Sequence, residues 1–160
     1  MTLGNKDRFH FRSIEQKDEK FVRKIIFDLL ESYALPLDLE GADADLTDIC
    51  EHYRDGLFGV ITDTASDEIV GSYALYPINS EKLELRKMYI KKAYQGMGLG
   101  KYSLDLCEAY AQRKGYEWII LETASVLKTA IKLYEKNGYT LSQDPLHTDR
   151  CDIVMSKKIN

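Results

Sequence analysis

The stretch YQGMGLGKYSLDL, residues 94–106, places three glycines within five positions and then continues in a pattern typical of a helix. Glycines at 96, 98 and 100 remove side chains from the turn, so main-chain amides can approach a ligand closely. The first amides of a helix have no partner inside the helix and favour an anion. The stretch therefore predicts an anion-binding turn. The alternative is a turn without a ligand, in which the glycines only end a strand and begin a helix.

Three known phosphate-binding patterns compete for this turn. A P-loop would need glycine at Gln95 and serine or threonine at Tyr102, so both of its ends fail. A dinucleotide-binding fingerprint would need a further glycine at Lys101 or Ser103, and it fails as well. The pattern QxxGxG, which begins at Gln95, is satisfied. It presents main-chain N–H groups at a helix N-terminus to an anion in the same way as the other two.

The pattern around the turn predicts an α/β fold with a mixed sheet, because strands come first, then alternate with helices, and then return. Apolar and β-branched runs bounded by turn residues predict strands over 8–14, 57–62, 68–78, 82–90 and 117–123, with closing strands within 139–143 and 151–159. Helical spacing predicts helices over 16–32, 46–53, 98–114 and 128–137. On the strand over 82–90, simple alternation predicts Glu84, Arg86, Met88 and Ile90 on one face.

The composition is typical of a globular protein. The chain has 160 residues, 44% of them hydrophobic and 30% charged, and a net charge of −4. An acidic balance argues against a nucleic-acid partner, which favours a basic footprint. The sequence has no apolar run long enough to cross a membrane, and residues 1–13 lack the apolar core of a secretory signal. A cytoplasmic protein without membrane contact is the expectation.

The cysteines and histidines do not form a recognisable metal motif. The three cysteines are widely spaced, odd in number and without CxxC spacing, and the three histidines are isolated: Cys50, Cys107, Cys151, His10, His52 and His147. This usage predicts reduced thiols in a reducing compartment and no metal site.

Two segments together resemble the GNAT superfamily of acyl-CoA-dependent N-acetyltransferases: LELRKMYIKKAYQGMGLGKYSL (83–104) and AIKLYEKNGYTL (130–141). The resemblance implies one N-acetyltransferase domain over residues 1–160, with a central, mostly antiparallel sheet of six to seven strands flanked by about four helices. It also implies acetyl-CoA as co-substrate. Main-chain groups of the turn would hold its pyrophosphate and the preceding strand its pantetheine arm. The residues concerned are Gln95, Gly96, Met97, Gly98, Leu99, Gly100 and Lys101 for the turn, and Met88, Tyr89 and Ile90 for the strand.

Two catalytic residues follow from the same resemblance. Glu84, six residues before Ile90 on its strand, matches the catalytic glutamate of several family members and is the candidate base. Tyr134 in LYEK matches the tyrosine that protonates the departing thiolate, and helical spacing places it on the inward stripe of its helix. The alternatives without a catalytic role are a solvated or ion-paired Glu84, and a Tyr134 that packs in the core with its hydroxyl bonded to a main-chain carbonyl. The family's cofactor-contacting asparagine is replaced by Leu127.

The expected reaction is transfer of an acetyl group to a primary amine of a small molecule or peptide, by direct attack in a ternary complex. The acidic run over 38–55 raises the alternatives of a cationic acceptor or a solvated surface. Lys87, Lys91 and Lys92 are candidates to attract the phosphates. A non-catalytic acyl-CoA sensor of the same fold and a nucleotide-binding regulatory domain remain alternatives. A homodimer, which the family often forms, is possible.

Overall fold

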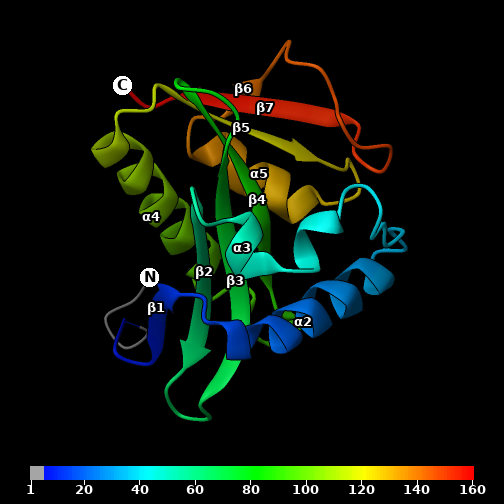
Figure 1. The fold of residues 1–160 in the computed structure, drawn as a ribbon, viewed down its shortest axis with the longest axis vertical. Helices are drawn as coiled ribbons and strands as arrows, with labels where there is room; N and C mark the ends of the chain where they lie inside the picture. Colours follow the sequence, from blue (N-terminus) through cyan, green and yellow to red (C-terminus); the bar gives the residue numbers. More distant parts are fainter. Residues whose placement is uncertain (1–5) are drawn as a thin grey trace.

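The computed structural model describes residues 6–160, and the first five residues of the N-terminal segment discussed above lie outside the described part. Seven strands form one sheet (Figure 1). They are β1 (Phe9–Ser13), β2 (Leu57–Asp63), β3 (Glu68–Pro77), β4 (Lys82–Ile90), β5 (Trp118–Thr123), β6 (Thr140–Leu141) and β7 (Ile153–Lys158). Their spatial order is β1-β2-β3-β4-β5-β7-β6. Neighbouring strands are antiparallel except for β4 and β5, which are parallel.

Within residues 6–160, four α-helices cover the two faces of the sheet. They are α2 (Glu19–Ser32), α3 (Ile49–His52), α4 (Leu99–Lys114) and α5 (Lys128–Lys136), with short 3-10 turns η1 (Gln16–Asp18), η2 (Ala44–Leu46) and η3 (Lys92–Tyr94). In Figure 1, α2 and α3 lie in front of the strands, and α4 and α5 lie behind them. Two hydrophobic clusters correspond to these layers, one under each pair of helices. The predicted mixed α/β fold is therefore confirmed.

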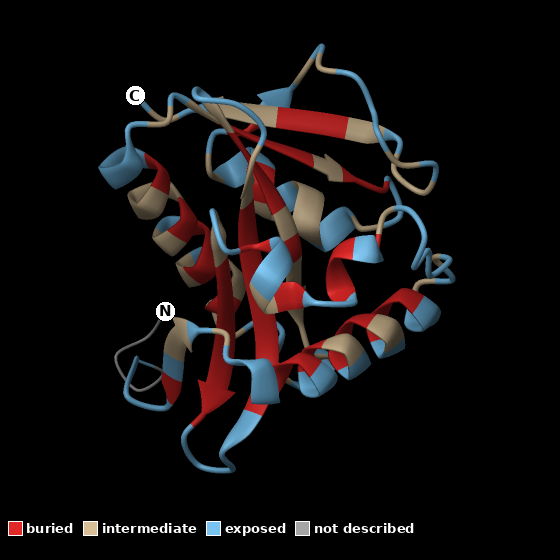
Figure 2. Ribbon diagram, in the orientation of Figure 1, coloured by how far each residue is buried: buried red, intermediate tan, exposed pale blue. Residues whose placement is uncertain are grey.

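The central strands carry most of the core. Figure 2 shows β2 and β3 buried over nearly their whole length, because helices pack on both of their faces. The α2 helix buries Val22, Ile25, Ile26 and Leu29, which recur at the spacing of a one-sided amphipathic helix. No helix in residues 6–160 combines the length and the apolar character that crossing a bilayer requires.

The predicted helix over 46–53 is shorter in the structure than its pattern suggests. The segment divides into η2 and α3, because Asp48 has a non-helical conformation between them and caps α3. Its Oδ1 accepts a hydrogen bond from the Glu51 amide at 3.2 Å. An Asx residue with a free amide three positions later is a common helix start, so the interruption has a local cause.

A bulge at Lys87 interrupts β4. Lys87 has a φ of +50°, which is unusual for a residue with a side chain, and the pairing with β3 skips a position between Ser72 and Ala74. The Ser72 hydroxyl donates to the Lys87 carbonyl at 2.7 Å and fixes the bulge from the neighbouring strand. One extra residue in a strand reverses the alternation of the side chains that follow it.

The prediction that Glu84, Arg86, Met88 and Ile90 share one face of β4 is wrong for this reason. Met88 and Ile90 pack with the core under α4, whereas Tyr89 packs with the core under α2 and α3. Glu84 and Arg86 precede the bulge and lie on that second face, with Arg86 over the ring of a tyrosine that packs against the same core. The bulge thus brings Glu84, Arg86 and Tyr89 to one side of the sheet.

The parallel pairing of β4 and β5 is short. It runs from Lys82 opposite Trp118 to Leu85 opposite Leu121 and stops there, although β4 continues to Ile90. We call the opening between residues 86–90 of β4 and residues 122–123 of β5 the fork. Beyond its base, β4 remains paired only with β3, while β5 pairs with β7.

Candidate active site

The glycine turn at the end of β4 has the conformation of an anion site. Gly96 and Gly98 have φ values of +79° and +82°, and Gly98 is the N-cap of α4. The first helical bond runs from the Tyr102 amide to the Gly98 carbonyl at 3.1 Å. The amides of residues 99–101 precede that bond, so the helix leaves them available to a ligand. Left-handed glycines are what allow the chain to enter the helix in this way.

The other two residues of the pattern have structural roles of their own. The side-chain Nε2 of Gln95 donates to the Ile90 carbonyl at 2.9 Å and connects the turn to the end of its strand. A Cβ on Gly100 would lie 3.2 Å from the Leu133 side chain, so this glycine lets α4 pack closely against α5. Packing between the helices is therefore a second reason for the glycine, besides access for a ligand.

The edge of β4 inside the fork has main-chain groups that no neighbouring strand uses. The Lys91 amide donates to the Val70 carbonyl of β3 at 2.9 Å. Because these groups alternate along a strand, those of Tyr89 also point toward β3, and those of Met88 and Ile90 point into the fork, where the Ile90 carbonyl already accepts from the Gln95 side chain. An extended ligand lying beside Met88 and Ile90 can bond to this edge as an added strand would.

Glu84 lies at the base of the fork and is ion-paired. Its side chain is 10% exposed, and one carboxylate oxygen accepts from Arg86 at 2.9 Å. The Arg86 guanidinium lies 4.3 Å from the ring centre of Tyr76, within cation–π range. Glu84 is thus held in place with one oxygen occupied.

Tyr134 is buried at the inner end of the fork. Its ring centre lies 5.9 Å from that of Tyr139. Burial raises the pKa of Tyr134, and the neighbouring Tyr89 hydroxyl raises it further, so the phenol carries its proton at neutral pH. Within residues 6–160 its hydroxyl makes no hydrogen bond. The alternative in which this hydroxyl bonds a main-chain carbonyl is therefore not what the structure has.

Lys87 does not face the expected phosphate site. Its Nζ is buried, 2.7 Å from Oδ1 of Asp43 and 3.2 Å from Oδ1 of Asp45. Arg150 binds Asp43 from the other side, with Nη1 at 2.5 Å and Nη2 at 2.9 Å. Desolvation opposes the charge on Asp43, but these cations together hold its pKa at about 2. Two acids of the run over 38–55 are therefore structural, and the run is not simply a solvated surface.

The sequence did not identify three side chains at this site, those of Tyr89, Arg150 and Glu122. Burial raises the pKa of Tyr89 to about 12, while Arg150 opposes the shift. The main-chain amide of His147 bonds to Glu122 on β5. Only the tertiary fold brings Arg150 and Glu122 to the fork, so no local sequence pattern identifies them.

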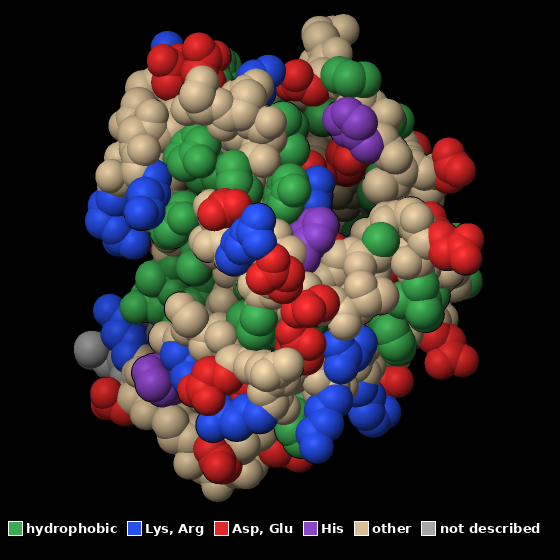
Figure 3. Space-filling view, viewed as in Figure 1, with side chains coloured by type: hydrophobic (Ala, Val, Ile, Leu, Met, Phe, Trp, Pro, Cys, Tyr) green, Lys and Arg blue, Asp and Glu red, His purple; other side chains and the backbone are tan. Residues whose placement is uncertain are grey.

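Figure 3 shows a hollow between α3 and the segment that joins β6 to β7, with acidic, basic and histidine side chains around it.

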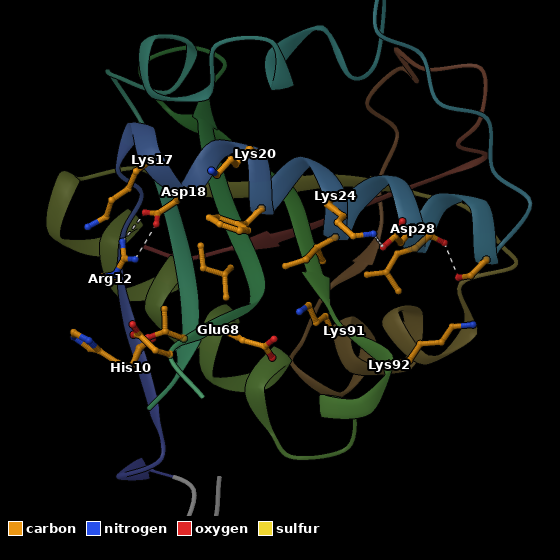
Figure 4. Close-up of a pocket in the computed structure, with 17 residues that line it drawn as sticks. His10, Arg12, Lys17, Asp18, Lys20, Lys24, Asp28, Glu68, Lys91 and Lys92 are labelled. Carbon is orange, nitrogen blue, oxygen red and sulfur yellow. Dashed lines mark hydrogen bonds and ion pairs between the residues drawn. The ribbon is translucent and has the colours of Figure 1, made fainter. Parts of the chain in front are cut away.

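A cavity of about 820 Å³ lies elsewhere, between α2, β1 and the residues that follow β4 (Figure 4). Lys20 and Lys24 line it from α2, and Lys91 and Lys92 line it after β4. Lys91 and Lys92, two of the lysines expected to attract the cofactor phosphates, thus face this cavity, whereas Glu84, Tyr134 and the residues of the glycine turn are not among its lining residues. It is a separate basic cavity on the α2 face.

The comparisons with known proteins agree with this geometry. A family model described as "Acetyltransferase (GNAT) family" matches residues 23–139. Uncharacterized N-acetyltransferase YjgM of Escherichia coli K12 is 29% identical over 157 residues, covering 92% of this chain and 93% of that protein. A protein described as probable N-acetyltransferase 14 of Xenopus tropicalis is 35% identical over 77 residues, which is 48% of this chain and only 37% of that protein.

A solved structure has the same fold. The PaiA N-acetyltransferase of Thermoplasma acidophilum, in complex with coenzyme A, superposes with a TM-score of 0.73 and 19% identity. The match covers 94% of this chain and 98% of that one. At this identity the likeness concerns the fold alone.

Proposed function

The chain belongs to the acetyltransferase (GNAT) family, and from that premise we propose that it moves an acetyl group from acetyl-CoA to a primary amine of a small molecule or peptide. The observation that carries this proposal is the unpaired edge of β4, which leads directly to the glycine turn. A thioester with a long amide-bearing arm and a pyrophosphate matches such an edge and turn, in that order.

The cofactor-binding part of the proposal uses main-chain groups. The turn from Gln95 to Lys101, through Gly96, Met97, Gly98, Leu99 and Gly100, holds the pyrophosphate. Met88 and Ile90 bond the pantetheine amides, and Tyr89 contributes its ring rather than its amide. About four residues separate Ile90 from the base of the fork, or roughly 13 Å at the rise of a strand. An arm laid along this edge brings its thioester to the region of Glu84 and Tyr134.

The chemistry then requires that the ammonium nitrogen lose two protons and that the departing thiolate gain one. An alkylammonium has a pKa of about 10 and must lose its proton before it attacks the carbonyl carbon. Glu84 takes this proton, directly or through water. The amine nitrogen bonds to the carbonyl carbon, the carbon–sulfur bond breaks, and Tyr134 protonates the thiolate. The new amide nitrogen releases its second proton, and the Tyr134 phenolate regains a proton from solvent. The raised pKa keeps Tyr134 protonated at neutral pH, so the phenol has a proton to give when the thiolate forms.

The remaining expectations belong to the same proposal. Residues 1–160 act as one N-acetyltransferase domain in the cytoplasm, on a small-molecule or peptide amine rather than on nucleic acid or membrane. Sedimentation at several protein concentrations measures whether the protein forms a homodimer.

An amine panel tests the activity. The protein is incubated with acetyl-CoA and spermidine, tyramine or lysine amide, while free thiol is followed and acetylated products are identified by mass spectrometry. Acetylated amine together with thiol supports the proposal. Tight binding of acetyl-CoA without thiol release across a broad panel supports a sensor of the same fold, and tighter binding of an adenine nucleotide than of coenzyme A supports a regulatory nucleotide-binding domain.

A further inference from the structure

The segment that joins β6 to β7, residues 142–152, is held across the fork by charged side chains. Asp144 pairs with Lys82 of β4 at 3.0 Å, and Arg150 pairs with Asp43. Asp152 accepts from the Ser125 amide at 2.7 Å. We call this segment the strap. Asp144 fixes its start to the beginning of β4, and Arg150 and Asp152 fix its end to segments beside the fork.

Glu122 is the anchor of the strap at the fork itself. It follows Leu121, the last residue of β5 that pairs with β4. Glu84 lies opposite Ile120 in that pairing, so alternation places Glu122 on the same face of the sheet as Glu84. The Glu122 side chain is only 7% exposed. A buried carboxylate is therefore present at the base of the fork, on the side of the predicted base.

The partner of Glu122 is His147 of the strap. The His147 amide donates to Oε1 of Glu122 at 2.5 Å, and the imidazole Nδ1 lies 3.5 Å from Oε2. No lysine or arginine of residues 6–160 forms an ion pair with Glu122. A carboxylate beside Nδ1 favours the proton on that nitrogen, which leaves the lone pair on Nε2. The His147 side chain is 62% exposed, so Nε2 has access to water and to a bound acceptor.

Other charged groups around His147 do not replace this partner. Asp144 of the strap acts electrostatically on His147, but its carboxylate is already bonded to Lys82 and Ser142. Glu84, on the neighbouring strand, is bonded to Arg86. Glu122 is therefore the carboxylate that accepts a hydrogen bond from the His147 amide and lies beside the His147 imidazole.

We propose that His147, oriented by Glu122, is a second proton acceptor for the attacking amine, a role that rests on the acetyl transfer proposed above. Glu84 takes the first ammonium proton. The second proton, which the nitrogen must lose once it has bonded to the carbonyl carbon, passes to Nε2 of His147, directly or through one water. The electron pair freed by loss of the first proton forms the bond to the carbonyl carbon, and the carbon–sulfur bond breaks. The thiolate that departs takes its proton from Tyr134, whose phenolate is reprotonated from solvent. The exposed imidazolium returns its proton to solvent, whereas Glu84 is too deeply buried to do so directly.

The first test needs no substrate. In protein with ¹⁵N-labelled histidine, NMR at alkaline pH identifies which ring nitrogen of His147 carries the proton. We expect the Nδ1–H form in the wild type and a shift toward Nε2–H in Glu122→Gln, which keeps an oxygen for the His147 amide. An Nε2–H form in the wild type would overturn the assignment.

The second test measures turnover with the best amine of spermidine, tyramine and lysine amide. We expect His147→Ala to lower kcat by about 10²-fold, the usual contribution of a positioned base, with the Kd of acetyl-CoA unchanged and with partial rescue by added imidazole. His10→Ala, which changes an exposed histidine of β1, is the matched control and should keep the wild-type rate. Full activity of His147→Ala, or a loss that imidazole does not relieve, would overturn the proposal. A wild type that binds acetyl-CoA but acetylates no amine would instead refute the proposed function, and the NMR result would still decide the His147–Glu122 pairing.

Discussion

Lys87 Nζ and Asp43 Oδ1 lie 2.7 Å apart in a buried ion pair that joins the bulge of β4 to the loop before η2. Arg150 binds the same carboxylate from the strap. Three segments that are distant in sequence are thus tied together beside the fork, and two carboxylates, Asp43 and Asp45, surround one ammonium. The geometry of the bulge, and with it the direction of Met88 and Ile90, depends on this group of charges.

Lys87→Met is expected to destabilise the protein by about 3 kcal/mol, because it leaves the buried Asp45 without a cation and Asp43 with Arg150 alone. The measurement is urea unfolding at neutral pH. Lys101→Met is the matched control, since Lys101 is an exposed lysine paired with Asp105 on one helix, and such pairs contribute about 0.5 kcal/mol or less. Equal losses of unfolding free energy in the two variants would show that the buried ion pair stabilises the protein no more than the exposed one.

The same carboxylate predicts a loss of stability in acid. The pKa of Asp43 is about 2 in the folded protein, below its ordinary value of 3.8. A lowered pKa contributes stability that is complete above the unfolded value and is lost as the pH falls from about 4 toward 2. The difference in unfolding free energy between wild type and Asp43→Asn should therefore be largest near neutral pH and shrink across that interval. A difference independent of pH would contradict this assignment.

The fold was predictable because each long element has its own local signal. The strand over 82–90, the glycine turn and the helix that ends before Gly115 are found where the pattern places them. The faces of β4 were not predictable, because the bulge at Lys87 adds one residue and no local pattern announces it. The Ser72 hydroxyl that supports the bulge comes from β3, and a contact of this kind is invisible in the sequence of β4.

The site was predictable only in its contiguous parts. The turn and Tyr134 belong to short motifs, so their positions follow from spacing. The acidic run was harder to read, because Asp43 and Asp45 meet Lys87 and Arg150 only through tertiary contacts. Without those partners the run resembles either a solvated loop or a cation site.

Gly98→Val is expected to weaken acetyl-CoA binding by at least about tenfold, because a branched side chain enters the turn where the pyrophosphate is proposed to bind. The φ of +82° at Gly98 means that valine also strains the backbone. Gly115→Val is the matched control, since Gly115 has a φ of +79° at the other end of α4. Calorimetric titration should show weakened binding only for Gly98→Val, with similar losses of stability in both. Unchanged affinity in a folded Gly98→Val protein would remove the turn from the cofactor site.

Glu84→Gln is expected to lower kcat by about 10²-fold at neutral pH. The deficit should shrink as the pH rises toward the amine pKa of about 10, because more of the acceptor is then already deprotonated. Rates with a primary amine are compared from neutral to alkaline pH, and Glu81→Gln, an exposed residue beside the start of β4, is the control. A deficit that is constant with pH would indicate that Glu84 positions the acceptor rather than taking its proton.

Tyr134→Phe is expected to lower kcat by about 10²-fold while the Kd of acetyl-CoA changes little, because only the proton donor is removed and the ring remains. Tyr139→Phe is the matched control: its ring lies 5.9 Å away, and its buried hydroxyl has no hydrogen-bond partner among the described residues. Loss of that hydroxyl should leave turnover intact and cost no stability, because an unsatisfied buried group is removed. The two variants differ by one oxygen at neighbouring sites in the same core, so a rate loss confined to Tyr134→Phe assigns the effect to proton transfer. Weakened acetyl-CoA binding with full turnover at saturation would instead make Tyr134 a packing residue.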